Sequence, residues 1–483
     1  MNEAPYTVKV NLCGGVVSPG DLFELLVIAE KVGVDAVSLG TRQQLYFSMD
    51  KAYAEDLEYL MLAANVVYEL DANEYPNIVS SYVSEAIFNS GSWLKEGVYK
   101  DIFDQFTYRP RLKINLVDNT QTFVPFFTGN LNFISSDLNN HWYLYIRFPK
   151  TSQLCCCPFL IYSDDIPQVS QMIEEVIYNN RSEFYDQEQV DENSFFDLLK
   201  PLLNFTQPLN EPLTLPDFYL PYYEGFNWYT DNKYWLGVYR RNELFPLDFL
   251  KDVCALCLQT RIGQLYTTPW KSFLVKNIDQ ADRRRWENLL NKHRLNVRHA
   301  ANELNWQVED QCADGLGLKK YLVREFEEAD LRTYRLCFAI KTQPRTGLFG
   351  SIVLRKQEHA WDILYTRDFN PNSKDFLSYK SRLSEDELRE HLIDLVQFYY
   401  QSYSNSELNI TGNSLPENEV KAEGIMKTVY QCIHCMSVYD EIYGEEISGI
   451  LPGTSFDTIS AYTCLVCGSS KDDFRAKEWT VLS

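Results

Sequence analysis

Residues 430–474 read YQCIHCMSVYDEIYGEEISGILPGTSFDTISAYTCLVCGSSKDDF and contain four cysteines in two Cys-x-x-Cys pairs. A Cys-x-x-Cys pair forms a tight turn, a knuckle, which aims both thiolates at one ion. Two knuckles complete a tetrahedral site of four sulfur ligands, which suits iron or zinc. We therefore predict a metal site whose ligands are Cys432, Cys435, Cys464 and Cys467.

The residues between the knuckles narrow the choice of metal. The run GILPGTSF at 449–456 resembles the corresponding run of rubredoxins, and five aromatic residues match the positions of the small rubredoxin core: Tyr430, Tyr439, Phe456, Tyr462 and Phe474. The resemblance implies a small C-terminal domain that holds one iron in four thiolates and passes single electrons. A structural zinc module remains the alternative.

Three residues depart from the rubredoxin pattern. Met436 replaces a glycine, Leu465 replaces a proline, and Ser437 replaces a core aromatic. These changes predict altered hydrogen bonding to the sulfurs and an altered reduction potential. The module, 429–483, has 8 acidic and 3 basic residues, a net charge of −5, which favours docking on a basic partner.

The rest of the chain contains a weak internal duplication. At an offset of 228 residues, Leu22 pairs with Leu250, Ala29 with Cys257, and Leu45 with Phe273. The first copy contains an amphipathic helix pattern at 21–32, in which apolar residues share one face. We predict two half-modules related by a pseudo-twofold axis.

An α+β architecture with five segments follows from these patterns. Helices are expected at 166–184 and 383–403, the second with a capping box of Ser384 and Glu387, and strands at 36–49, 111–118 and 141–148. The proposed segments are a first half at 1–185, a proline-rich linker at 186–230, a second half at 231–405, a connector at 406–428 and the metal module at 429–483.

Two short motifs connect the duplicated body to a known family. Thr41-Arg42-Gln43 and Thr267-Thr268-Pro269-Trp270-Lys271 resemble signatures of the ferredoxin-like half-domains in sirohaem nitrite and sulfite reductases. That family is itself a duplication with the same order of segments. The resemblance implies that Arg42, Arg111 and Lys113 bind an anion or a tetrapyrrole. Arg111 and Lys113 would share one face of a strand, because side chains alternate; two solvated surface cations are the alternative.

The cluster ligands of that family do not recur. The resemblance places the cysteines of its [4Fe–4S] cluster at Cys312, Leu318, Gln343 and Gly347. Leucine, glutamine and glycine provide no thiolate, so no [4Fe–4S] cluster is expected.

Two other groups of cysteines are predicted not to bind metal. Cys254 and Cys257 lie three residues apart on an expected helix, where core packing is favoured over a redox pair. The adjacent Cys155, Cys156 and Cys157 point to alternate faces of a strand.

These observations favour an electron-transfer protein over an enzyme. The metal module would pass electrons to a nitrite or sulfite reductase partner from a reductase-like scaffold, and a further redox protein would reduce the module. One alternative is a reductase that binds sirohaem or another tetrapyrrole and is fed by its own rubredoxin module. Another is a tetrapyrrole-binding protein with a zinc-filled module.

Composition excludes some other partners. The net charge of −22 disfavours nucleic acid and anionic membranes, which carry charge of the same sign. The sequence contains no run of 18 apolar residues, and its beginning lacks the pattern of a secretory signal. A cytoplasmic protein is therefore the expectation.

Overall fold

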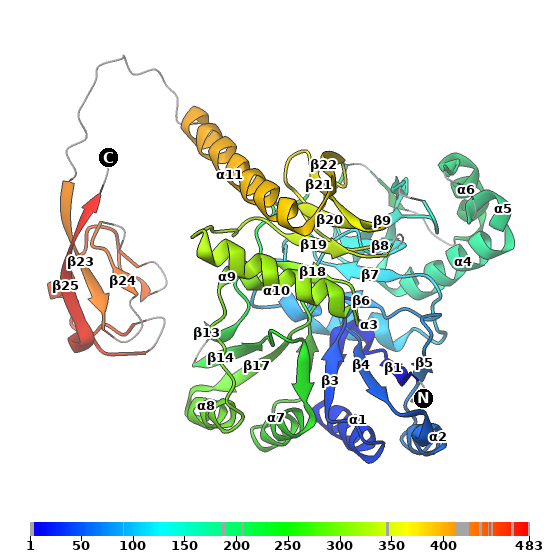
Figure 1. The fold of residues 1–483 in the computed structure, drawn as a ribbon, viewed down its shortest axis with the longest axis horizontal. Coiled ribbons are helices and arrows are strands. Elements are labelled where there is room, and N and C mark those ends of the chain that lie inside the picture. The colour runs from blue at the N-terminus through cyan, green and yellow to red at the C-terminus, as the bar shows by residue number, and fades with distance from the viewer. Residues whose placement is uncertain are drawn as a thin grey trace. The chain divides into compact units, whose positions relative to one another are not determined.

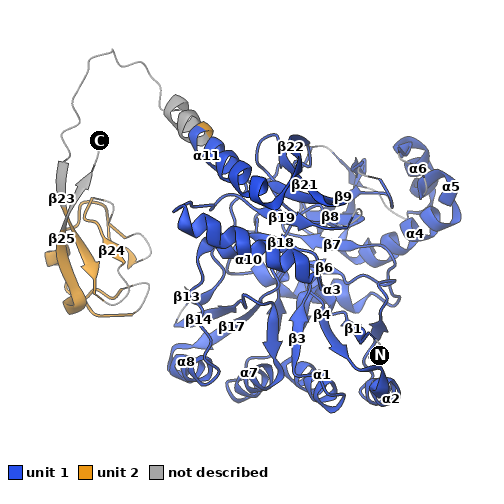
Figure 2. Ribbon diagram, viewed as in Figure 1, with its two compact units in different colours: residues 1–401 blue, residues 402–483 orange. Residues whose placement is uncertain are grey.

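The structure is a computed structural model that describes residues 4–410 and 425–481, apart from residues 90, 152, 186, 188, 204–206, 210, 231, 344–346, 434–436, 443, 446–447 and 465–467. The chain divides into two compact units, which Figure 2 colours separately. Residues 1–401 form the body and residues 402–483 form the C-terminal unit. Much of the predicted connector, 411–424, lies outside the described residues.

The duplication is visible in the order and spacing of the elements of the body. Helices α1 (Pro19–Lys31) and α7 (Leu247–Gln259) begin 228 residues apart, and so do strands β4 (Leu45–Met49) and β17 (Phe273–Asp279). These elements therefore recur at the offset that the sequence duplication predicts. The expected strand at 36–49 is two strands, β3 (Ala36–Leu39) and β4, joined by a turn.

Each half contributes one strand to the five-stranded sheet of the other half. The first sheet has the order β15-β3-β4-β1-β5, and the second has the order β13-β14-β17-β16-β2. Strand β2 (Val16–Val17) of the first half pairs with β16, and β15 (Leu244–Pro246) of the second half pairs with β3. The remaining strands are β1 (Tyr6–Val10), β5 (Tyr68–Leu70), β13 (Gly225–Thr230), β14 (Lys233–Val238) and β16 (Leu265–Thr267).

Four helices cover these two sheets in one row. Figure 1 shows α8 (Arg283–Lys292), α7, α1 and α2 (Ala54–Ala63) side by side, and neighbouring helices of the row contact each other. Their apolar faces share one core with both sheets. Cys254 and Cys257 are fully buried in it, and burial raises the pKa of Cys254 to about 12. The structure thus supports core packing for this pair.

Two mixed sheets complete the body. One has the order β12-β11-β9-β8-β7-β6, and the other has the order β18-β19-β20-β21-β22. In each, three consecutive strands are parallel. The strands are β6 (Val79–Ser80), β7 (Ile114–Val117), β8 (Leu131–Ser135), β9 (His141–Ile146), β10 (Cys155–Cys156, beside β9), β11 (Phe159–Tyr162), β12 (Gln207–Pro208), β18 (Trp306–Val308), β19 (Phe338–Lys341), β20 (Ile352–Gln357), β21 (Ala360–Thr366) and β22 (Phe376–Leu383).

The other helices lie beside the mixed sheets. The helix expected at 166–184 is interrupted at Asn180, whose amide side chain bonds the carbonyl of Val176 at 2.9 Å. The capping box is confirmed, because the Ser384 amide donates to Glu387 at 2.8 Å and the Glu387 amide donates to the Ser384 hydroxyl at 3.4 Å. The helices are α3 (Glu96–Asp104), α4 (Ile166–Asn179), α5 (Arg181–Phe184), α6 (Glu192–Leu199), α9 (Ala301–Leu304), α10 (Ala313–Glu328) and α11 (Glu385–Ile410).

No described helix combines the length and the apolar character that a membrane crossing requires.

The C-terminal unit is built on a small antiparallel sheet with the strand order β24-β23-β25. Its strands are β23 (Ile425–Cys432), β24 (Val438–Tyr439) and β25 (Phe474–Val481). Cys432 is the last residue of β23 and lies opposite Phe474. The sheet therefore fixes the backbone position of the first predicted metal ligand.

Gly237 permits the close approach of strand β14 to the segment that precedes strand β13. A Cβ atom at this position would lie 1.8 Å from the carbonyl oxygen of Tyr223, which is backbone and has little freedom to move. We expect Gly237→Ala to lower the free energy of unfolding of the body by about 1–3 kcal/mol. Thermal unfolding followed by circular dichroism measures this. The control is Gly263→Ala, where the added Cβ meets open space; equal melting temperatures for the two variants would contradict the prediction.

Candidate metal centre and cationic cavity

Two of the four predicted ligands lie within the described part of the C-terminal unit. Cys432 and Cys464 are both buried, with 0% and 2% of their surfaces exposed. Each makes the same local hydrogen bond: the Cys432 amide donates to the Ser437 carbonyl, and the Cys464 amide donates to the Ser469 carbonyl, both at 2.8 Å. The two knuckles therefore have matching backbones at their first cysteines. Cys435, Cys467, Met436 and Leu465 lie outside the described residues.

An aromatic core supports these cysteines. The Phe456 ring lies at its centre, stacked on Tyr430 with ring centroids 4.3 Å apart and within 5.4 Å of Phe474. Tyr439 and Tyr462 pack at its sides. Cys432 and Cys464 belong to the same apolar cluster, so the core keeps water away from their sulfur atoms.

A hydroxyl group lies beside one sulfur. The Ser437 Oγ is 2.9 Å from the Sγ of Cys464, so the second residue after the first knuckle contacts the first cysteine of the second knuckle. This contact follows from the sequence departure at Ser437, which puts a short polar side chain where rubredoxins are expected to have an aromatic ring.

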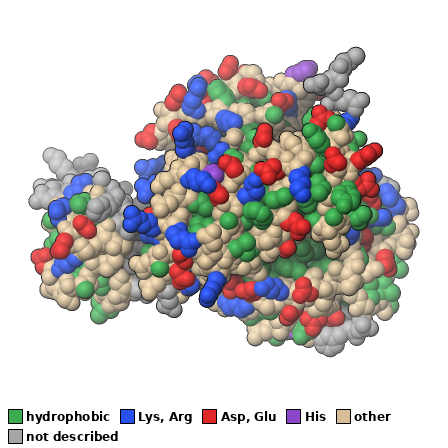
Figure 3. Space-filling model, turned by 90° about the horizontal axis from the view of Figure 1, so that it is seen from below, with side chains coloured by type: hydrophobic (Ala, Val, Ile, Leu, Met, Phe, Trp, Pro, Cys, Tyr) green, Lys and Arg blue, Asp and Glu red, His purple; other side chains and the backbone are tan. Residues whose placement is uncertain are grey.

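The body contains a large cavity, and the described charged residues that line it are all lysines and arginines. Its volume is about 1080 Å³, and it lies between residues of the two mixed sheets. Within the described residues, no aspartate or glutamate lines it. Its cations are Lys113, Arg147, Lys150, Lys341, Arg355 and Lys374. By contrast, acidic and basic side chains are interspersed over the face of the molecule seen in Figure 3.

Burial and mutual repulsion perturb these cations. Burial, reinforced by Arg42 and Arg147, lowers the pKa of Lys113 to about 8. Burial, reinforced by Arg147, lowers the pKa of Lys374 to about 7. Burial also lowers the pKa of Lys341, and Arg355 is paired with Asp362 at 2.8 Å. A group of cations that repel one another in a hollow is an electrostatic site for an anion.

A smaller cavity of about 370 Å³ shares Lys113 with the larger one and also contains Arg42. The Arg42 guanidinium donates to the carbonyl of Asn77 at 2.7 Å, to that of Ile114 at 3.0 Å and to the amide oxygen of Asn115 at 3.2 Å. Arg42 therefore fastens the β3–β4 turn to β7, besides lining the cavity.

Arg111 is placed differently from the sequence prediction. Strand β7 begins only at Ile114, so the alternation expected for Arg111 and Lys113 does not apply. The Arg111 side chain pairs with Glu74 at 3.3 Å on the surface, where both are about half exposed. The surface alternative therefore describes Arg111, whereas Lys113 points into the cavities.

The loops expected to hold cluster cysteines are joined by a carboxylate. Of the four aligned positions, Cys312 alone is a cysteine; its Sγ accepts a hydrogen bond from the Gly315 amide at the start of α10. Glu309, in the loop after β18, accepts from the amides of Thr342 and Gln343 at 2.8 and 3.0 Å. One thiol and a linking carboxylate do not fit a cluster that needs several thiolates.

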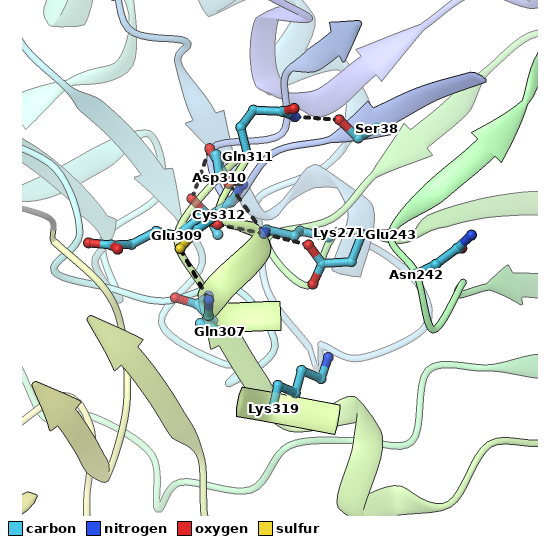
Figure 4. Close-up of polar contacts among 12 residues, drawn as sticks. Ser38, Asn242, Glu243, Lys271, Gln307, Glu309, Asp310, Gln311, Cys312 and Lys319 are labelled. Atoms are coloured by element: carbon cyan, nitrogen blue, oxygen red, sulfur yellow. Dashed lines mark hydrogen bonds and ion pairs between the residues drawn. The ribbon is translucent and has the colours of Figure 1, made fainter. Parts of the chain in front are cut away.

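The residue after Glu309, Asp310, belongs to a network of charged side chains. In Figure 4 the Lys271 amino group points between Glu243 and Asp310, at distances of 2.6 and 3.8 Å. Asp310 also accepts a hydrogen bond from the Thr41 amide at 2.9 Å, and burial raises the pKa of its carboxyl group. The two half-domain signatures thus meet in space, because Thr41 and Lys271 contact the same carboxylate.

Sequence comparison agrees with the geometry of the C-terminal unit. The Rubredoxin family model matches residues 429–474. The Rubredoxin of Acinetobacter baylyi is 48% identical over 50 residues, which are 10% of this chain and 93% of that protein. The chain belongs to the rubredoxin family through this unit.

Some rubredoxin relatives are longer proteins. The High molecular weight rubredoxin of Moorella thermoacetica is 48% identical over 46 residues, and Rubredoxin-1 of Pseudomonas putida is 43% identical over 44 residues. Each match covers 9% of this chain, and they cover 20% and 25% of those proteins. The rubredoxin likeness therefore concerns one unit and not the whole chain.

The fold of the body matches that of a solved structure. The structure of the Mycobacterium tuberculosis NirA protein superposes with a TM-score of 0.63, covers 80% of this chain and 79% of that chain, and has 13% sequence identity. This likeness confirms the predicted fold of the body, joined to a rubredoxin unit.

Several cavity residues were missed by sequence reasoning. Arg147 and Lys341 each lie at the carboxyl end of an apolar strand, and this position is a signal that the sequence offered. Lys374 lies in the loop between β21 and β22, where the sequence gives no signal.

Glu309 should stabilise the body through its two backbone hydrogen bonds. Glu309→Ala removes the carboxylate that accepts hydrogen bonds from the amides of Thr342 and Gln343, at a net cost of about 0.5–1.5 kcal/mol for each hydrogen bond lost. Urea unfolding of the full chain measures the loss. The matched control, Glu328→Ala, removes a carboxylate that is 65% exposed and should change stability by less than about 0.5 kcal/mol. Similar midpoints for both variants would refute this role of Glu309.

Proposed function

We propose that the protein is a one-electron carrier whose iron is held by Cys432, Cys435, Cys464 and Cys467. The observation that carries this proposal is the burial of Cys432 and Cys464, with matching knuckle hydrogen bonds, in one aromatic core. Four thiolates supply an iron site that changes between the ferric and ferrous states without losing a ligand. The core excludes water and so limits solvent reorganisation during electron transfer.

The acceptor that we propose is a nitrite or sulfite reductase partner, and the donor is another redox protein. The reductase-like fold of the body supports this assignment by analogy of shape. The body would serve as the docking scaffold, without a [4Fe–4S] cluster. The acidic rubredoxin unit, with a net charge of −5 over 429–483, favours basic partner surfaces. In this proposal the segment 406–428 connects two separately folded parts.

The iron site predicts the effect of removing one ligand. Cys464→Ser should lose the bound iron and the visible thiolate-to-iron bands, while the body keeps its unfolding transition. Metal analysis and visible spectra before and after dithionite measure this, with Cys337→Ser, at a buried cysteine of the body, as the control that retains iron. Wild-type protein that binds only zinc, or bands that dithionite does not bleach, would overturn the electron-transfer proposal.

A second candidate function rests on the larger cavity. Its cations, with no acidic lining residue in the described part of the chain, fit a macrocycle that carries several carboxylates, such as sirohaem. Sirohaem would supply an iron centre for reduction of nitrite or sulfite. Lys113, Arg147 and Lys374 would hold its carboxylates, and the rubredoxin unit would supply electrons.

The cavity predicts anion binding that weakens as pH rises. Lys374 and Lys113, with pKa values of about 7 and 8, are protonated at pH 6 and lose protons toward pH 9. An anion favours their charged forms, so binding takes up protons. We expect uroporphyrin, an iron-free porphyrin rich in carboxylates, to quench tryptophan fluorescence with an affinity that falls over this range.

A single substitution tests whether the cavity is the binding site. Lys374→Gln should weaken uroporphyrin binding at pH 6 by about tenfold or more, because a charge-assisted hydrogen bond contributes about 1.5–3 kcal/mol. Lys320→Gln, at an exposed lysine of α10, is the control. Unchanged affinity in the Lys374 variant, or affinity that does not depend on pH, would count against the second candidate.

A further inference from the structure

The contact between Ser437 and Cys464 connects the two knuckles of the metal site. Ser437 lies two residues beyond the first Cys-x-x-Cys pair, and Cys464 begins the second. The Ser437 Oγ and the Cys464 Sγ are 2.9 Å apart. Ser437 is held in this position because its carbonyl oxygen accepts the amide hydrogen of Cys432 at 2.8 Å.

Metal binding decides the direction of this hydrogen bond. A cysteine binds metal as a thiolate, which has no proton, so only the hydroxyl of Ser437 remains to donate. The Cys464 side chain is 2% exposed and packs in the aromatic core. In such surroundings a hydrogen bond is electrostatically stronger than in water.

We propose that Ser437 raises the reduction potential of the iron by donating a hydrogen bond to the Cys464 sulfur. This inference rests on the proposed iron site. On reduction, an external one-electron donor supplies one electron and ferric iron becomes ferrous. All four thiolate bonds remain, no proton is transferred, and the site becomes more negative by one charge. The hydroxyl dipole stabilises that more negative state more than the oxidised state, so reduction becomes easier.

The test compares potentials of the iron-loaded full chain. We expect Ser437→Ala to shift the one-electron reduction equilibrium about tenfold toward ferric iron. This shift corresponds to a decrease in the reduction potential of about 59 mV. The thiolate-to-iron absorption should also move to longer wavelength, because the sulfur lone pairs lose a stabilising donor. Redox titration followed by visible absorption records both quantities.

Three further variants separate the hydroxyl from the packing. Ser437→Thr keeps the hydroxyl and should keep the potential near that of the wild type. Ser437→Val introduces a side chain with nearly the shape of threonine but without a hydrogen-bond donor. Its reduction potential should therefore be as low as that of Ser437→Ala. Ser448→Ala removes a hydroxyl that bonds Glu445 at the surface and should leave the potential unchanged. If Ser437→Ala fails to retain iron, the threonine and valine pair still decides the question.

The outcomes distinguish this inference from the proposal on which it rests. Suppose that the wild-type protein holds iron and bleaches reversibly, but that the threonine and valine variants have equal reduction potentials. This result would overturn the role of Ser437 and leave the proposed iron site standing. Wild-type protein without a reducible iron would overturn both. A potential that falls in the alanine and valine variants but not in the threonine variant supports the assignment.

Discussion

The body depends on a reciprocal exchange of strands between its halves. Strand β2 completes the sheet of the second half, and β15 completes the sheet of the first. Neither half therefore closes its own sheet with its own strands. Helices α1 and α7 pack against each other, and Lys251 of α7 pairs with Glu30 of α1 at 2.6 Å. The exchange fixes the two halves of the body relative to each other. Residues of the two mixed sheets can therefore line the same cavity.

That cavity has an electrostatic character opposite to that of the chain. The protein has a net charge of −22, yet the described charged residues that line the larger cavity are all cations. Burial lowers the pKa values of Lys113 and Lys374, and repulsion by neighbouring cations lowers them further. Keeping these lysines charged in the cavity therefore costs free energy. A bound anion would offset it, which is the physical basis of the second candidate function.

The two units place their cysteines in different surroundings. Around Cys312, the carboxylate of Glu309 joins the loops after β18 and β19. In the C-terminal unit, Cys432 and Cys464 are buried among aromatic rings, within the stretch that the rubredoxin family model matches. A covalent link between this rubredoxin unit and the body raises their effective concentration toward each other.

The sequence by itself determined the elements that depend on local pattern. The spacing of the cysteines and the run at 449–456 identified the rubredoxin unit, and the 228-residue offset paired α1 with α7. Both signals are contained in short stretches of chain. The strand expected at 111–118 was less well placed, since β7 starts only at Ile114 and the Arg111 side chain reaches Glu74.

Only the tertiary structure decided which side chains meet. The larger cavity combines Arg147 and Lys341, which lie at strand ends in different halves, with Lys374 from a loop. Only the folding of the chain brings them together around Lys113. The contact of Ser437 with Cys464 joins residues 27 positions apart. The strand exchange likewise pairs β2 with β16 across the whole first half. Such contacts depend on how distant segments pack, and residue spacing along the chain carries no record of that packing.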